Sequence, residues 1–149
     1  MAQNNTQPKQ RLEMKPVTIK VLIDGERIDI SLRLKMSPPK ITTTIRNQEK
    51  AVLGDNIFDC FIKLRKEHPD VKFLCKGAKI NVFPSRMSAQ MSGMIAYEMT
   101  LGYPALNKDK VDIFDYDDAD IADSYEQQLN FYKSWIDSIR NRSKSVNPD

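Results

Sequence analysis

Histidine, cysteine and glycine are scarce in this chain of 149 residues, which has one histidine, two cysteines and five glycines. A structural zinc site needs about four Cys or His ligands, and small secreted domains held by disulfides carry more cysteines than this chain does. The glycines are too scattered for a phosphate-binding loop or a dinucleotide fingerprint. We therefore expect no metal site, no cofactor and no disulfide framework, and we place Cys60 and Cys75 as free thiols in a reduced, cytoplasmic compartment.

Long apolar runs are missing as well. No segment approaches the ~20 apolar residues that a membrane helix needs, and the first ten residues are polar, without the apolar stretch of a signal peptide. The chain has 23 basic and 20 acidic residues, so its net charge of +3 calls for neither a nucleic-acid nor a membrane partner. We expect residues 1–15 to form a disordered arm, residues 16–142 a single domain and residues 143–149 a frayed tail.

A β-hairpin over residues 17–34 is the clearest element. Apolar and polar residues alternate on both sides of Asp24-Gly25, a dipeptide typical of a type I′ turn. A two-residue turn pairs Val21 with Ile28, and this register places the apolar side chains of both strands on one face. Pattern and register therefore agree.

The remaining segments predict mixed elements in an α+β fold. Prolines in 36–40 end the second strand, and a threonine-rich loop is expected up to about Lys50. After it we predict a helix capped by Asp55 and ending near His68, a hairpin over 71–83 turning at Lys76-Gly77, a short helix capped by Ser85 or Ser88, strands near 95–99 and 111–114, and a helix over 119–142. The predicted fold is an antiparallel sheet of about six strands built from hairpins, with one or two short helices and a long C-terminal helix covering one face.

The segment 84–93 is the best candidate for a functional surface. Pro84 ends the strand before it, and the turn that follows is rich in methionine and serine. A serine nucleophile needs a base within reach, but the single histidine, His68, lies at a predicted helix end. The Gly-x-Ser-x-Gly pattern of a nucleophile elbow is absent too. We therefore predict no catalytic residue.

A protein contact is the functional interpretation of this segment. Methionine adapts its shape to a partner, and arginine is a common interface anchor. The candidate contact residues are Ser85, Arg86, Met87, Gln90 and Met91. The structural alternative is that Met87, Met91 and Met94, at i, i+4 and i+7, pack a short helix onto the sheet.

Acidic residues cluster before the last helix, at Asp112, Asp115, Asp117, Asp118, Asp120 and Asp123. Dense carboxylates can bind Mg²⁺ or Ca²⁺. The calcium-loop pattern, however, requires a glycine and a glutamate at set positions. This run has no glycine, and Ala119 follows the aspartates instead, so the pattern does not match. The cluster is then either a solvated helix N-terminus or a surface for a cationic partner. For the second interpretation the candidates are Asp115, Asp117 and Asp118.

The motifs Cys75-x-Gly77-Ala78, Pro84-Ser85-x-Met87 and Val111-Asp112-x-Phe114 resemble those of small bacterial single-domain proteins. Some of these are immunity proteins of contact-dependent or polymorphic toxin systems. The resemblance covers about residues 55–116 and carries no catalytic residue across. It implies a non-enzymatic, cytoplasmic, bacterial protein that binds and neutralises a toxin domain.

Two other functions stay open. A nucleic-acid-binding module would use a basic face made by Lys63, Arg65, Lys66, Lys72, Lys76, Lys79 and Arg86, although no helix-turn-helix or RNP pattern accompanies it. A small enzyme would have to combine Arg86 with the aspartates. Of the three, we favour the protein-binding module.

Overall fold

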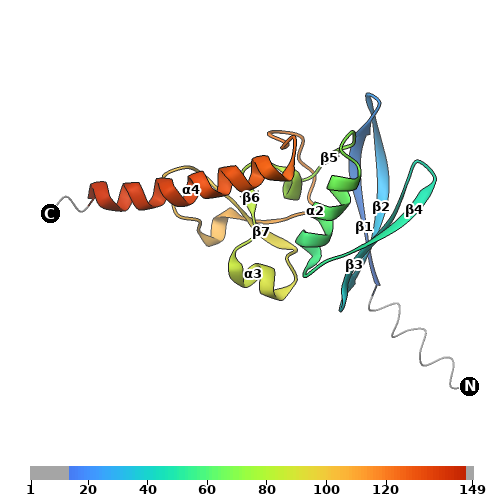
Figure 1. The fold of residues 1–149 in the computed structure, drawn as a ribbon, viewed down its shortest axis with the longest axis horizontal. Coiled ribbons are helices and arrows are strands. Elements are labelled where there is room, and N and C mark those ends of the chain that lie inside the picture. Colours follow the sequence, from blue (N-terminus) through green and yellow to red (C-terminus); the bar gives the residue numbers. More distant parts are fainter. Residues whose placement is uncertain (1–13, 147–149) are drawn as a thin grey trace, which may run out of the picture.

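A computed structural model describes residues 14–146 of the chain (Figure 1). In this part the chain forms two antiparallel sheets and three α-helices. The predicted α+β class, with hairpin-built antiparallel sheet and a long C-terminal helix, is confirmed. The first strand begins at Met14 and the last helix reaches Val146, so both enter the segments expected to be an arm and a tail. The rest of those two expectations, residues 1–13 and 147–149, lies outside the described residues.

The strands are divided between a five-stranded sheet and a three-stranded sheet. The first has the order β4-β3-β2-β1-β5 and the second the order β6-β7-β8. The strands are β1 (Met14–Ile23), β2 (Glu26–Met36), β3 (Pro39–Ile45), β4 (Gln48–Leu53), β5 (Lys72–Leu74), β6 (Val82–Phe83), β7 (Ile95–Glu98) and β8 (Lys110–Asp112). The helices are α2 (Ile57–Glu67), α3 (Arg86–Met91) and α4 (Tyr125–Val146), with 3₁₀ turns η1 (Lys76–Ala78) and η2 (Asn107–Asp109).

The hairpin of β1 and β2 has the predicted register, in which Val21 pairs with Ile28 and Ile19 with Ile30. Asp24 and Gly25 both have positive φ, at 51° and 81°, as a type I′ turn requires. The alternation buries one face of the hairpin, because Ile19, Val21 and Ile30 lie in the core while the residues between them are largely exposed.

The expectation of a loop between Met36 and Lys50 is wrong, because this segment forms the hairpin of β3 and β4. Its turn residues Arg46 and Asn47 both have positive φ, at 53° and 64°. The strand was missed because its threonines suggested an exposed loop. Thr43 is in fact buried, with only 2% of its surface exposed. Its hydroxyl donates a hydrogen bond to the Ser31 carbonyl at 2.8 Å, which satisfies the buried polar group.

The predicted second hairpin over 71–83 is also wrong. β5 pairs with β1 in the first sheet, whereas β6 pairs with β7 in the second. Lys76 and Gly77 form part of η1, and the φ of Gly77 is not positive, so the two-residue turn is absent. The Gly77 amide donates to the Ile113 carbonyl at 2.7 Å, and a Cβ at Gly77 would lie 2.8 Å from the Ile113 Cβ. Glycine is needed there for a close approach of two chain segments.

The observed helix boundaries differ from the predicted ones by one or two residues at α2 and by more at α4. Asn56, not Asp55, caps α2, with its side chain accepting from the Asp59 amide at 2.8 Å. α4 begins at Tyr125, six residues later than predicted. The delay arises because Ile121 bridges Lys79 as extended chain, and Asp120 has a φ of 56°, which ends any helical run there.

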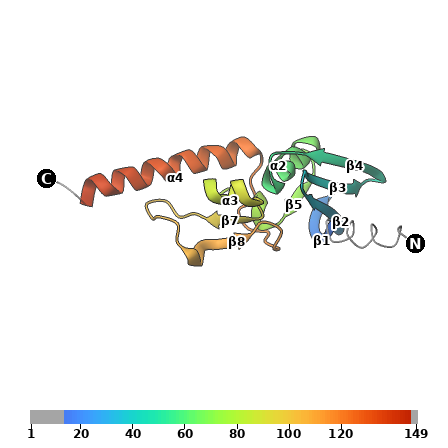
Figure 2. The ribbon, with the colours of Figure 1, turned by 90° about the horizontal axis from the view of Figure 1, so that it is seen from below.

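The core is centred on α2, which packs against β3 and β4 of the first sheet. Phe61 of this helix is fully buried and makes edge-to-face contacts with Phe73, at 5.6 Å between ring centroids, and with Phe114, at 5.4 Å. These contacts join α2 to segments on both sides. Figure 2 shows α4 lying over the second sheet, with its N-terminal end near α2.

Gln128 connects α4 to the rest of the molecule through buried polar contacts. The side chain is fully buried, and its amide nitrogen lies 2.9, 2.7 and 3.2 Å from the carbonyl oxygens of Gly77, Lys79 and Val82. Its amide oxygen accepts from Arg65 Nη2 at 2.7 Å. One side chain thereby contacts three main-chain carbonyls of the 77–82 segment and links this segment to α2.

The second half of α4 is held by the loop that follows β7. The Trp135 indole donates to the Tyr103 carbonyl at 2.9 Å, and Ser138 Oγ accepts from the Gly102 amide at 2.8 Å. Arg142 donates to the Gly102 carbonyl at 2.7 Å and lies over the Tyr103 ring. Three helix side chains therefore bind main-chain atoms of one loop.

We predict that Cys60 and Cys75 react slowly with a thiol reagent in the native protein. Both are free and fully buried, and burial raises the pKa of Cys60 to about 11 and that of Cys75 to about 12, which removes the reactive thiolate at neutral pH. Labelling followed by mass spectrometry should be slow under native conditions and fast in denaturant. Rapid native labelling of either cysteine would disprove its burial.

We predict that Gln128→Met lowers the free energy of unfolding by about 3 kcal/mol, because several buried carbonyls lose their donor together. Methionine nearly keeps the volume, so lost hydrogen bonding and not a cavity should account for the loss. Urea denaturation measures the difference. Asn130→Met, at an exposed position of the same helix, is the matched control and should change stability by less than about 0.5 kcal/mol. Equal stability of the two variants would contradict the role of Gln128.

Candidate functional site

Helix α3 is a short element that is capped at its N-terminus and bound to α2 at its C-terminus. Ser85 caps it, with its hydroxyl accepting from the Ser88 amide at 3.1 Å, as predicted. At its other end the Asn56 side-chain amide donates to the Ala89 carbonyl at 3.0 Å, and the Ile57 amide donates to the Ser92 carbonyl at 2.8 Å. The C-terminal carbonyls of α3 thus meet the N-terminal donors of α2, which positions the short helix.

The methionines of α3 point into solvent. Met87 is 72% exposed and Met91 79% exposed, whereas Met94, after the helix, is buried. Of the three methionines that could pack a short helix onto the sheet, only Met94 lies in the core. Met87 and Met91 do not take part in such packing. Arg86 and Gln90 are exposed on the same short helix, so four of the five candidate contact residues of this segment are accessible, and Ser85 is the half-buried cap.

Asp117 lies in an ion-pair network that is mostly shielded from solvent. Its Oδ2 accepts from Lys79 Nζ at 2.8 Å and from Lys76 Nζ at 3.1 Å, and its Oδ1 accepts from the Ala119 amide at 2.9 Å. The buried Lys79 also contacts Glu98 at 2.8 Å. The Lys79 ammonium and the Ala119 amide hold the pKa of the Asp117 carboxyl well below its usual range.

The other two acidic candidates have different surroundings. Asp118 Oδ2 accepts from Arg27 Nη2 at 2.9 Å and from the Tyr116 hydroxyl at 3.1 Å. Asp115 is exposed, and its main-chain carbonyl accepts from the Lys76 amide. Since Asp117 and Asp118 are bound within the chain, only Asp115 of the three has no ion-pair partner among residues 14–146.

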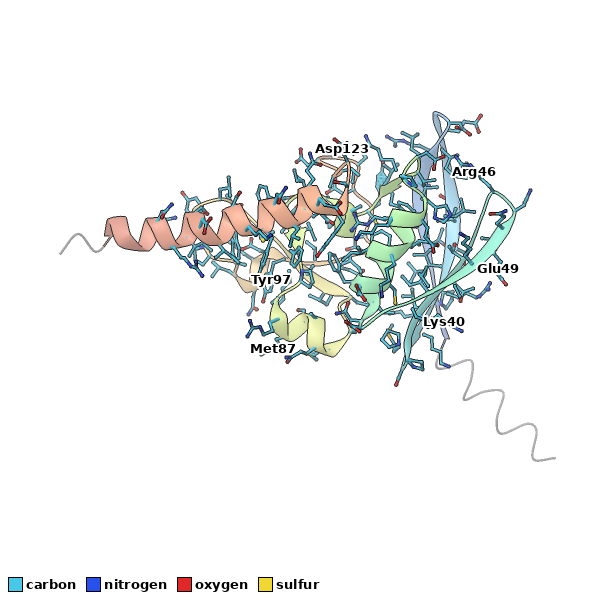
Figure 3. The ribbon with its side chains drawn as sticks, in the orientation of Figure 1. Lys40, Arg46, Glu49, Met87, Tyr97 and Asp123 are labelled. Atoms are coloured by element: carbon cyan, nitrogen blue, oxygen red, sulfur yellow. The ribbon has the colours of Figure 1, made fainter. Side chains whose placement is uncertain are left out.

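The labelled side chains of Met87 and Asp123 show how α3 lies relative to the end of the acidic loop, residues 112–123. In Figure 3, Met87 lies at the lower edge of the molecule and Asp123 at the upper edge, with the body of the fold between them. Met87 and Asp123 therefore lie on opposite sides of the molecule in this view. Among residues 14–146, no ion pair joins Arg86 to Asp117 or Asp118, which pair with Lys79 and Arg27.

The basic residues singled out in the sequence are partly used inside the fold. Lys76 and Lys79 pair with Asp117, and Lys63 lies 3.3 Å from Asp59. Arg65 turns inward to Gln128. Four of the seven basic residues of the nucleic-acid alternative are therefore engaged within the fold, whereas Lys66, Lys72 and Arg86 form no ion pair among the described residues.

Sequence reasoning missed the polar partners that matter most for the fold. Gln128 had a usable signal, because it stands at i+3 from Tyr125 and i−4 from Tyr132, within the apolar stripe of α4. Lys79 had none, because a lysine alternating with apolar residues resembles the outer face of a strand. Within the described residues, no group of three or more His, Cys, Asp or Glu side chains is arranged to hold a metal ion.

In comparisons with known proteins, no protein-family model matches the chain and no curated sequence matches it at a significant level. In the part of the chain that the structure describes, no helix is both long and apolar enough to cross a membrane.

We predict that Asp117→Asn lowers the free energy of unfolding at pH 7 by about 3 kcal/mol, because it leaves the buried Lys79 without one of its counter-charges. A carboxyl whose pKa is depressed by folding stabilises above its ordinary pKa of about 3.9 and loses this contribution as pH falls below that value. The difference in the free energy of unfolding between the parent and Asp117→Asn should therefore narrow below about pH 4.

Chemical denaturation at several pH values measures this gap. Asp118→Asn is the matched control, because its ion pair with Arg27 is solvent-exposed and should contribute no more than about 1 kcal/mol. A pH-independent gap, or an equal loss in the control, would contradict the assignment.

Proposed function

We propose that this protein is a non-enzymatic protein-binding module and that α3 is its contact surface. The observation that carries the proposal is the exposure of Met87 and Met91, 72% and 79%, one helical turn apart on a capped helix whose C-terminal end is bound to α2. Single exposed apolar residues are common on proteins. Two flexible thioethers side by side on a rigidly held helix are instead suited to insertion into a partner's groove.

The charge of α3 indicates the chemistry of the partner. The helix has no acidic residue in its first turn, and its single charged side chain is Arg86, which is exposed. A complementary partner therefore offers an apolar groove for the methionines and a carboxylate at the edge for the guanidinium. Such an arginine at the edge of an apolar contact is a common hot spot.

The specific form of the proposal is a toxin-neutralising protein in the bacterial cytoplasm, with a toxin domain as the partner. This form is supported by the resemblance of residues 55–116 to immunity proteins. The contact would rest on α3 and not on the aspartates, because Asp117 and Asp118 are engaged with Lys79 and Arg27. Nucleic-acid binding is the weaker alternative, since ion pairs occupy several of the lysines it requires.

We predict that Arg86→Ala weakens binding of the partner by about 2 kcal/mol or more, which is the size expected for an interface hot spot. Met87→Ser with Met91→Ser should weaken it as well. All three side chains are exposed, so unfolding transitions should stay within about 0.5 kcal/mol of the parent. The partner is first captured from the native host with the parent chain, and its affinity for each variant is then measured by calorimetry with purified components.

Leu106→Ser is the matched control, because Leu106 is an exposed apolar residue in a different loop, and its loss should leave the affinity unchanged. For the toxin-neutralising form, the parent chain should protect cells that express the captured toxin domain, and the methionine double variant should not. If the α3 variants bind normally and Asp115→Ala abolishes binding, the acidic loop is the surface and the proposal is wrong.

A further inference from the structure

We propose that the cavity between the C-terminal end of α2 and the N-terminal end of α4 binds a small organic anion, with Arg65, which lines it, as the main source of positive charge. The cavity has a volume of about 380 Å³, within the range of small-molecule sites. It uses none of the residues of α3, so it is independent of the protein contact proposed above.

Arg65 is the reason to expect an anion. No carboxylate among the described residues forms an ion pair with it. Its Nη2 donates to the neutral amide oxygen of Gln128, its Nε is buried without a hydrogen-bond partner, and its Cζ lies 4.9 Å from the centroid of the Phe61 ring. A desolvated cation without a counter-charge is costly, and an anion in the cavity would supply that charge.

The guanidinium stays charged despite its surroundings. Burial lowers the pKa of Arg65 to about 10, which is still well above neutral pH. Gln128 accepts one hydrogen bond from the guanidinium, and the Phe61 ring packs against it. Both groups are neutral, so neither balances its positive charge. An anion in the cavity would therefore be attracted by this uncompensated positive charge.

The rest of the lining fits an anion with an apolar body. Lys66 lies 5.3 Å from the centroid of the Tyr125 ring, and Lys72 and His68 also line the cavity. The first residues of α4 complete the wall, where helical amides favour negative charge. The apolar part of the lining is Val71, Phe73, Ala78 and Ile121.

Three carboxylates also line the cavity, and they set its selectivity. Asp70 is neutralised by Arg46 at 2.6 Å, whereas Asp123 and Glu126 are exposed at the start of α4. Their position disfavours a highly charged ligand that fills the whole space. The geometry therefore points to a ligand with one carboxylate or one phosphate and a compact apolar group.

A titration followed by amide NMR shifts tests this assignment with three probes of similar size: benzoate, phenyl phosphate and the uncharged benzamide. Benzoate or phenyl phosphate should shift the amides of residues 65–73 and 121–126, and benzamide should not. Inorganic phosphate, added separately, shows whether the charge alone is enough. The proposal is wrong if benzamide binds as well as benzoate, or if none of the anions shifts these amides.

Arg65→Lys keeps the charge but loses the planar fork, and it should weaken anion binding about tenfold. If this variant does not fold, Lys66→Met with Lys72→Met provides the test, because both side chains are exposed, with an expected loss of up to about fivefold per lysine. Lys133→Met, at an exposed site of α4 outside the cavity, is the matched control and should bind like the parent. Unchanged affinity in the cavity variants would overturn the assignment.

Discussion

The fold depends on one buried amide. Gln128 binds three carbonyl oxygens of the 77–82 segment with its nitrogen and the guanidinium of Arg65 with its oxygen. This segment leaves the first sheet at β5 and enters the second at β6, so its main chain lacks the continuous ladder of a strand. Buried carbonyls must find donors. The two N–H groups of Gln128 are shared among three of these carbonyls, while the Ala122 and Met99 amides donate to those of Ala78 and Asn81. Gln128 thereby links this segment, α2 and α4 around one polar point.

The parts of the fold that the sequence predicted are those with local determinants. The β1–β2 hairpin has its turn dipeptide Asp24-Gly25 and a strict alternation, and α3 has its cap at Ser85. Both signals need only neighbouring residues. The fold class followed from them, although the division of the strands into two sheets did not.

The errors occurred where distant contacts decide the conformation. Lys76-Gly77 has the composition of a hairpin turn, but the close approach of Gly77 to Ile113 requires a 3₁₀ turn instead. The strand β3 was missed because the hydroxyl of Thr43 finds its acceptor on Ser31 of a neighbouring strand. For the candidate site, Arg86 and the two methionines were identified from composition, whereas the engagement of Asp117 by Lys79 depends on residues 38 positions apart.

The attachment of α4 to the loop after β7 has a consequence for sequence divergence. Trp135, Ser138 and Arg142 hold this loop through main-chain atoms of Gly102 and Tyr103. Gly102 itself is constrained, because its φ of 86° favours glycine, and the Tyr103 ring also contacts Arg142. Leu101 and Leu106 lie in the same loop, and each side chain is about half exposed. Outside Gly102 and Tyr103, the side chains of this loop can therefore change between lineages while the helix keeps its place, so this end of the molecule can acquire new surface chemistry without a new fold.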